Sequence, residues 1–172
     1  TRQHLCNFEG YTPLHLLRPI DRHFDLKTKG GGVSIFIKNN IDFKYREDLC
    51  LSTPTTECIF IELMHENKKY LIGGVYRVPN TNVKEFCDSI NRLIEPHRSH
   101  EIVLLGDFNI CLLQDNCHKH ELQNIMQTNS LFPTILTPTR VASVLRDGQL
   151  VTTQTLIDNI YLNTQNNFKS GS

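Results

Sequence analysis

One stretch near the middle of the chain, residues 102–110, constrains the fold more than any other. It begins with the branched apolar run Ile-Val-Leu-Leu, which has no helical period and predicts a strand buried on both faces. The run stops at Gly106, where a backbone without a Cβ can turn, and Asp107 and Asn109 follow. Ligands of open α/β sheets gather at strand ends. The stretch therefore predicts either a catalytic or metal site or an ordinary Asp/Asn turn after a strand.

Length and charge limit the class of protein. The 172 residues suit one domain, which we expect to span residues 1–172. Lys plus Arg and Asp plus Glu both number 18, so there is no global positive field and any polyanion would be gripped locally. No apolar run reaches the length of a membrane span or forms a signal segment. We therefore expect an intracellular protein without a membrane partner.

The six cysteines do not predict a disulfide framework, because they are irregularly spaced. Cys58 and Cys87 fall on apolar faces, where a reduced thiol packs as a small hydrophobe. Residues 111–120 hold two cysteines and two histidines, but their spacing matches no common zinc site and the segment leads into a helix. We expect no zinc there.

Apolar runs and alternation place the regular structure. They predict five further strands, at residues 33–38, 41–46, 57–63, 70–76 and 155–162. Apolar residues at helical spacing predict a helix from Val83 to Ile94, with Asn82 and Glu85 offering a capping box, and a shorter helix around residues 122–126. Strands alternating with helices indicate a layered α/β domain.

Two other segments complete this prediction. Residues 1–29 carry scattered aromatics, histidines and prolines without period, so we expect irregular structure there. The pair Asp147-Gly148 lies between two short apolar flanks and predicts a two-residue hairpin turn.

Two carboxylates interrupt apolar strand faces. Glu57 alternates with apolar residues, so it either begins its strand at a solvent edge or points inward and needs a partner; we expect the edge position. Asp158 shares a face with Leu156, Ile160 and Leu162. An isolated ionised carboxylate is unfavourable there, so we expect Asp158 to point inward with a dedicated partner, the alternative being a surface position.

Four motifs in order resemble the endonuclease/exonuclease/phosphatase superfamily: residues 74–80 (GVYRVPN), 105–109 (LGDFN), 137–140 (TPTR) and 155–160 (TLIDNI). The sequences Tyr-Arg-x-Pro, Pro-Thr-Arg-Val and Thr-Leu-Ile-Asp-Asn-Ile are most similar to the endonuclease domain of non-LTR (LINE-type) retrotransposon polyproteins. The resemblance covers residues 30–164. It implies an α/β layered sandwich of two packed, mainly antiparallel β-sheets flanked by helices, as in DNase-like proteins.

The resemblance also implies an activity and its partners. The reaction would be a Mg²⁺-assisted cut of a DNA phosphodiester, with Mn²⁺ as an alternative ion, whose free 3′ end primes reverse transcription. The partners would be DNA and the remainder of the retroelement polyprotein, including its reverse transcriptase, and the domain would act in the nucleus.

Residue roles follow from the same resemblance. Asp107 would deprotonate or orient the attacking water, and Asn109 would hold the phosphate or the water. Tyr76 would offer its hydroxyl to a non-bridging oxygen, and Asp158 would orient a catalytic histidine. Substrate contacts are expected from Arg77, Asn80, Thr137, Thr139 and Arg140.

The chain departs from the family pattern at both ends. The family's Ser-Asp-His motif, which carries that histidine, does not follow residue 164. The metal-binding glutamate should precede Gly30-Gly31-Gly32 by a longer stretch than is present, so the metal ligand is unknown. We expect a domain truncated at both ends that binds Mg²⁺ poorly and shows little nuclease activity by itself.

Two other function classes stay open. The chain could be a degenerate, non-catalytic module of the same fold that binds nucleic acid or protein, which the missing glutamate and histidine would permit. A relative that acts on lipid or inositol phosphates is a third reading, against which Tyr-Arg-x-Pro and Pro-Thr-Arg-Val count. Target-site preference is expected to come from loops such as residues 137–153 and from DNA shape.

Overall fold

A seven-stranded sheet forms the centre of the protein in the computed structural model, which describes residues 8–18, 31–146 and 149–163. The strand order is β3-β5-β6-β7-β11-β8, and β4 also pairs with β5. The bounds are β3 (Phe43–Tyr45), β4 (Leu51–Ser52), β5 (Thr56–His65), β6 (Lys68–Arg77), β7 (Glu101–Asp107), β8 (Phe132–Pro133) and β11 (Asp158–Leu162). Only β6 and β7 are parallel. The mainly antiparallel sheet that the sequence implied is confirmed.

Local chemistry explains the two connections at the centre of the sheet. Strands β5 and β6 form a hairpin closed by Glu66 and Asn67, which both have positive φ and so match the twist of the strands. A parallel pair needs a longer crossover. Helix α1 (Val83–Ile94) and the 3₁₀ turn η2 (Glu95–His97) supply it between β6 and β7.

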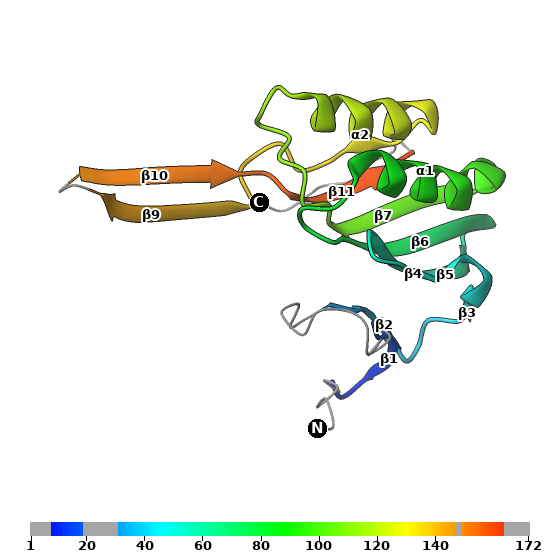
Figure 1. Ribbon diagram of the computed structural model, residues 1–172. Coiled ribbons are helices and arrows are strands. Elements are labelled where there is room, and N and C mark those ends of the chain that lie inside the picture. The colour runs from blue at the N-terminus through cyan, green and yellow to red at the C-terminus, as the bar shows by residue number, and fades with distance from the viewer. Residues whose placement is uncertain (1–7, 19–30, 147–148, 164–172) are drawn as a thin grey trace.

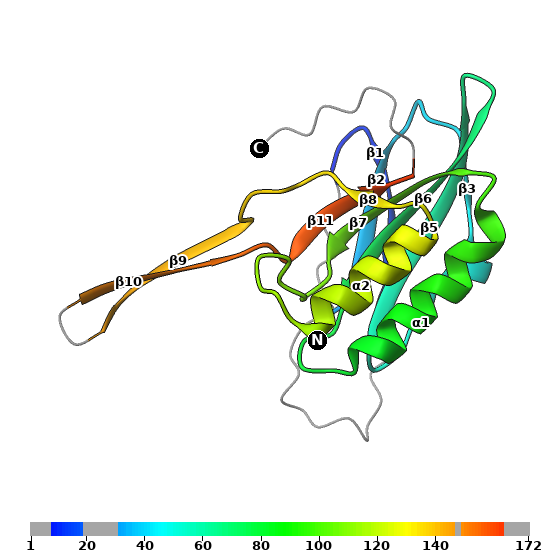
Figure 2. The ribbon, with the colours of Figure 1, turned by 90° about the horizontal axis from the view of Figure 1, so that it is seen from above.

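Two helices cover one face of the sheet and lie side by side (Figure 2). Helix α1 begins at Asn82, whose side chain accepts a 3.1 Å hydrogen bond from the Glu85 N–H. Helix α2 (Cys117–Thr128) begins in the same way at Asn116. Both predicted helices are confirmed. The core beneath them includes Phe60, Leu71, Phe86, Ile90, Ile102, Leu104, Leu122, Met126 and Tyr161.

A short antiparallel pair lies against the other face, formed by β1 (Tyr11–Leu16) and β2 (Val33–Lys38) (Figure 1). The expectation of irregular structure throughout residues 1–29 is wrong for β1, because pairing with β2 makes a strand of residues that include Pro13 and His15; residues 1–7 and 19–30 lie outside the described part. The pair packs on β5 and β6, so the predicted second sheet is present. On the same face of the neighbouring β7, Leu105 is 38% exposed.

A two-stranded arm projects away from the sheet (Figures 1 and 2), formed by β9 (Arg140–Arg146) and β10 (Gln149–Thr155). Arg146 pairs with Gln149, which confirms the two-residue connection, although residues 147–148 themselves lie outside the described part. The predicted strand 155–162 is divided. Its middle leaves the ladder because the carbonyl of Leu156 accepts from the Leu112 N–H and that of Ile157 from the Phe108 N–H.

The two α-helices have twelve residues each. Among the described residues, no helix is long and apolar enough to cross a membrane.

Candidate active site

Four polar side chains occupy one row across four neighbouring strands. Glu57 lies opposite Tyr76, Tyr76 opposite Asp107, and Asp107 opposite Asp158. Residues in register on adjacent strands point to the same face of a sheet. The site row, as we call these four residues, therefore lies on the face that carries β1 and β2, at the edge where β6 and β7 end. Three residues predicted to be catalytic are brought together here from distant segments.

The backbone at the end of β7 fixes Asp107. Gly106 has φ +149°, and a Cβ there would lie 1.8 Å from the Val75 carbonyl oxygen, so only glycine fits. Asp107 Oδ1 then accepts a 2.9 Å hydrogen bond from the Asn109 N–H. Burial and the nearby charge of Asp158 raise the pKa of Asp107, although the Asn109 N–H acts in the opposite direction. A carboxylate with a raised pKa is a stronger base.

Arg77 clamps the loop that follows Asp107. Its Nε donates to the Phe108 carbonyl and its Nη2 to the Asn109 carbonyl, both at 2.9 Å. Asn109, at φ +48°, returns a 2.8 Å hydrogen bond from Nδ2 to the Arg77 carbonyl, and Nη1 binds the Thr81 carbonyl at 3.0 Å. Arg77 is only 5% exposed, and burial lowers its pKa. Its position corrects the expected substrate contact: Arg77 acts on the site from inside the protein.

Asp158 is half-buried, and the charge nearest to it in the site row is that of Asp107. Its N–H and that of Ile157 both lie 3.4 Å from Thr139 Oγ1, which accepts from them. Within the described ranges, the Asp158 carboxylate makes no hydrogen bond or ion pair. Asp158 lies on the strand face away from the buried Asn159 and Tyr161 and is only partly inward. The dedicated partner that the sequence predicted is not found among the described residues.

The predicted substrate contacts divide into two groups. Thr139 lies against Asp158, and the exposed Arg140 is close enough for its charge to lower the pKa of Asp107. Asn80, at φ +60°, and Thr137 are exposed. No hydrogen bond or ion pair joins either of these two to the site row in the described part of the chain.

Glu57 is fully buried, so its predicted position at a solvent edge is wrong. Its carboxylate forms an ion pair with Arg18, and it also accepts a hydrogen bond from the Gly32 N–H. The partner comes from 39 residues away in the sequence. The only signal in the sequence was the alternation of Glu57 with Ile59 and Ile61 on one strand face, which favours an inward side chain.

The donor set of the site row suits a hard cation only in part. Asp107 and Asp158 offer carboxylate oxygens, the ligands that Mg²⁺ prefers. Among the described residues, no group of three or more His, Cys, Asp or Glu side chains gathers to hold a metal ion. The row therefore offers the ion a half-site, that is, two carboxylate ligands without a third acidic, histidine or cysteine ligand among the described residues.

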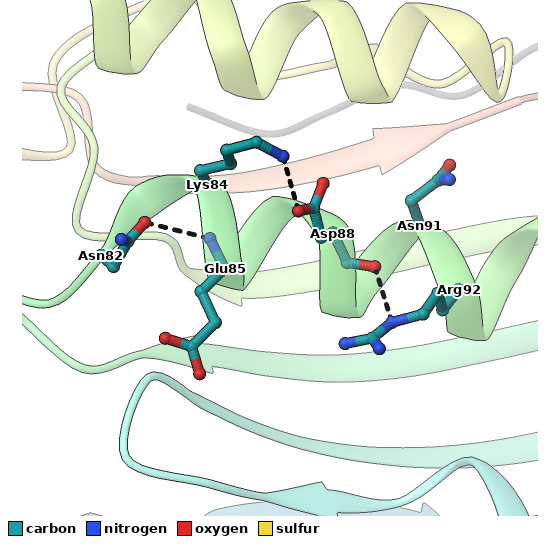
Figure 3. Close-up of a pocket in the computed structure, with 6 residues that line it drawn as sticks. All are labelled: Asn82, Lys84, Glu85, Asp88, Asn91 and Arg92. Carbon is teal, nitrogen blue, oxygen red and sulfur yellow. Dashed lines mark hydrogen bonds and ion pairs between the residues drawn. The ribbon is translucent and has the colours of Figure 1, made fainter.

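A polar groove of about 480 Å³ lies elsewhere, along the outer side of α1 (Figure 3). Lys84 binds Asp88 at 2.7 Å, and Arg92 Nε donates to the Asp88 carbonyl. The groove presents no converging free groups, so the site row is the better candidate. The lining residues are Asn82, Lys84, Glu85, Asp88, Asn91 and Arg92.

Solved structures resemble this arrangement, although no family model and no curated protein sequence matches the chain. The endonuclease domain of TRAS1, a telomere-specific non-LTR retrotransposon, superposes with a TM-score of 0.67 at 13% identity, over 90% of this chain and 68% of that one. An endonuclease/exonuclease/phosphatase family protein from Leptotrichia buccalis gives 0.61 at 16% identity, over 92% and 62%. The human Nocturnin catalytic domain with bound sulfate gives 0.55 at 16% identity, over 90% and 60%.

The chain has the endonuclease/exonuclease/phosphatase fold. The layered sandwich predicted from the sequence is thereby confirmed. In these three comparisons the chain spans 60–68% of the length of the solved chain. At identities of 13–16%, the likeness establishes the fold, and the activity of this endonuclease/exonuclease/phosphatase-fold chain has to be argued from its own site row.

Proposed function

We propose that this chain is the core of a Mg²⁺-dependent DNA endonuclease domain that nicks target DNA to prime reverse transcription in a retroelement. The observation that carries the proposal is the register of Tyr76, Asp107 and Asp158 on three adjacent strands. The likeness to the TRAS1 endonuclease domain and the four ordered motifs support the choice of DNA and of a retroelement. The proposed partners are DNA and the remainder of the polyprotein, with its reverse transcriptase, acting in the nucleus.

Each residue of the row has a place in phosphodiester hydrolysis. Asp107 takes the proton of the attacking water, a task that suits a half-buried carboxylate with a raised pKa. The water oxygen attacks phosphorus, the P–O3′ bond breaks, and the departing O3′ takes a proton from solvent water, so that a 3′-hydroxyl and a 5′-phosphate are released. The Tyr76 hydroxyl donates to a non-bridging oxygen, where negative charge builds. Asn109 holds the water through Oδ1, since its Nδ2 is engaged by Arg77.

The remaining charges position the polyanion. Asp158 orients the catalytic histidine that the family resemblance implies. Thr139 and Arg140 contact the DNA backbone at the base of the β9–β10 arm. Mg²⁺, or Mn²⁺ in its place, would be held by the carboxylate oxygens of Asp107 and Asp158 and supplies positive charge beside the phosphate.

A second candidate function is a non-catalytic nucleic-acid binding module of the same fold. The half-site of two carboxylates favours it, because the described residues add no third acidic, cysteine or histidine ligand. We therefore expect weak Mg²⁺ binding and little nicking by this chain alone.

The experiment that tests the proposal pairs DNA binding with nicking. Binding of a fluorescent duplex oligonucleotide is followed by anisotropy in Mg²⁺ and in EDTA, and plasmid nicking is followed under the same conditions. We expect Mg²⁺ to tighten binding, and D107N/D158N to bind DNA more tightly in EDTA and to lose the Mg²⁺ response, because two charges that repel phosphate are removed. D88N, on the outer face of α1, serves as the charge-matched single control for D107N.

The outcomes separate the candidates. EDTA-sensitive nicking that D107N abolishes supports the endonuclease and overturns the expected weak activity. If Mg²⁺ tightens DNA binding but no nicking occurs, the result supports a DNA-binding site that lacks some of the catalytic residues. DNA binding that ignores both Mg²⁺ and the D107N/D158N change overturns the proposed function.

A further inference from the structure

The fourth residue of the site row, Glu57, has no role in the reaction proposed above. It lies directly opposite Tyr76 on β5 and β6, and its exposed fraction is 0%. A buried carboxylate beside the residue that is proposed to contact phosphate would oppose the binding of an anion unless its charge is balanced. The way in which Glu57 is balanced therefore bears on the site.

Both oxygens of Glu57 are occupied by groups from the end of the β1–β2 pair where Leu16 lies opposite Val33. Oε1 accepts from Arg18 Nε, just after β1, and Oε2 accepts at 2.5 Å from the Gly32 N–H, just before β2. These contacts fasten both strand ends to the site row, next to Tyr76.

Gly31 and Gly32 pack closely against Arg18 and the end of β1. Gly31 has φ +120°, and a Cβ there would lie 2.5 Å from Arg18 Cζ. Gly32 has φ +95°, and a Cβ there would lie 2.9 Å from the Leu16 carbonyl oxygen. The guanidinium thus lies directly against a backbone that only glycine can form here. This fit accounts for Gly31 and Gly32 of the glycine triplet.

Arg18 is not placed to bind phosphate itself. Its Nη2 is inaccessible to solvent and has no hydrogen-bond partner among the described residues. Its side chain is 26% exposed, and its charge faces the fully buried Glu57. An indirect role, through position and charge balance, is what this geometry allows.

We propose that the Arg18–Glu57 pair is a positioning element for the Tyr76 phosphate contact, holding the end of the β1–β2 pair beside Tyr76 and keeping that end of the row neutral toward a nucleic-acid phosphate. The inference rests on the proposed function. It adds Arg18 and Glu57 to the residues that determine how tightly the site row accepts a phosphodiester backbone.

Opposite charge changes provide the test. With the duplex probe at pH 8 and 0.1 M salt, E57Q leaves Arg18 unbalanced and is expected to tighten DNA binding by about threefold, whereas R18Q leaves Glu57 unbalanced and is expected to weaken it by about threefold. The double variant R18Q/E57Q is expected to return to within about twofold of the wild type, and R18K, which keeps the charge, to stay near it. A pair that only supports the fold would shift both single variants in the same direction.

A matched control lies on the same strand. Arg46 and Glu62 form an ion pair at 2.8 Å with side chains 11% and 21% exposed. Glu62 is roughly 17 Å further along β5 than Glu57, at about 3.3 Å per residue. That exceeds the Debye length of about 10 Å at 0.1 M salt. E62Q and R46Q therefore make the same charge changes away from the row and are expected to leave DNA affinity unchanged.

Folding is checked by circular dichroism and thermal melting before binding is measured. If R18Q does not fold, the other two variants still test the inference. E57Q has to tighten DNA binding, and R18K has to leave the DNA affinity near the wild-type value. The inference is overturned if E57Q and R18Q shift the DNA affinity in the same direction, or if E62Q changes it as much as E57Q does. Loss of the response to D107N/D158N overturns the proposed function instead, so the two failures are distinguishable.

Discussion

Asp107 and Asp158 lie directly opposite one another on the antiparallel strands β7 and β11, on the same face of the sheet. Asp107 is held by the Asn109 N–H, while the Asp158 carboxylate has no hydrogen bond or ion pair within the described ranges. Two neighbouring, half-buried carboxylates destabilise the folded protein in its empty state. Such an arrangement is expected where a site is organised for a cation or a proton transfer.

The first prediction concerns Asp107→Asn. Burial and Asp158 raise the pKa of Asp107 above its ordinary value of 3.8, so the folded wild type loses stability as the pH rises through that higher pKa. Asparagine keeps the acceptor for the Asn109 N–H and removes the charge. We expect D107N to be more stable than the wild type at pH 7, by about 1 kcal/mol. The gain should shrink toward zero below pH 3.8.

Thermal melts across this pH range check the prediction. Asp88→Asn removes an exposed carboxylate bound to Lys84 and is the control that should show no such gain. A D107N variant that is less stable than the wild type at pH 7 would contradict the raised pKa.

Arg77→Ala is expected to lower the free energy of unfolding by roughly 3 kcal/mol, because it removes charged hydrogen bonds to the buried loop carbonyls of Phe108 and Asn109. Arg77→Lys should lose most of the same amount, since an ammonium cannot present the planar fork of donors. Urea unfolding at 25 °C measures both. A loss below about 1 kcal/mol for R77A would show that the clamp contributes little.

The variant R140A tests whether Arg140, and not the buried Arg77, contacts the substrate. Arg140 is exposed at the base of β9, so R140A should leave the unfolding free energy within about 0.5 kcal/mol of the wild type. It should weaken binding of the duplex and reduce the dependence of log K on log salt by about one unit, as for one lost phosphate contact. Anisotropy titrations at several salt concentrations measure the slope, and an unchanged slope would remove Arg140 from the interface.

His97 gives a second pH dependence at the far end of the sheet, where Arg46 Nη2 lies 3.4 Å from its Nε2. Burial, Arg46 and His100 lower the pKa of His97 below 6.5, so its contribution to stability is present above pH 6.5 and is lost as the pH falls through the lower folded value. We expect H97Q to lose less stability than the wild type in that interval. The difference should stay below about 1 kcal/mol, because solvent screens a partly exposed ring. Parallel melting curves for both proteins would contradict it.

Much of the fold could be predicted from local patterns. The helical spacing after Asn82, the alternation in residues 33–38 and the Asp147-Gly148 pair each specify an element through contacts between residues close in sequence. The ordered motifs led to the site row as well. Tyr76 and Asp107 end adjacent parallel strands, a relationship that strand-end polarity anticipates.

The sequence by itself determined both helices, most strands of the central sheet and which side chains share a strand face, because these depend on backbone geometry with a short period. Only the tertiary structure decided that residues 11–16 form β1, that Glu57 is buried with Arg18, and that Arg77 faces the loop carbonyls and not the substrate. Alternation tells which side chains point the same way, but what covers that face comes from a segment far along the chain. A buried charge is settled by its partner, and the partner is chosen by packing.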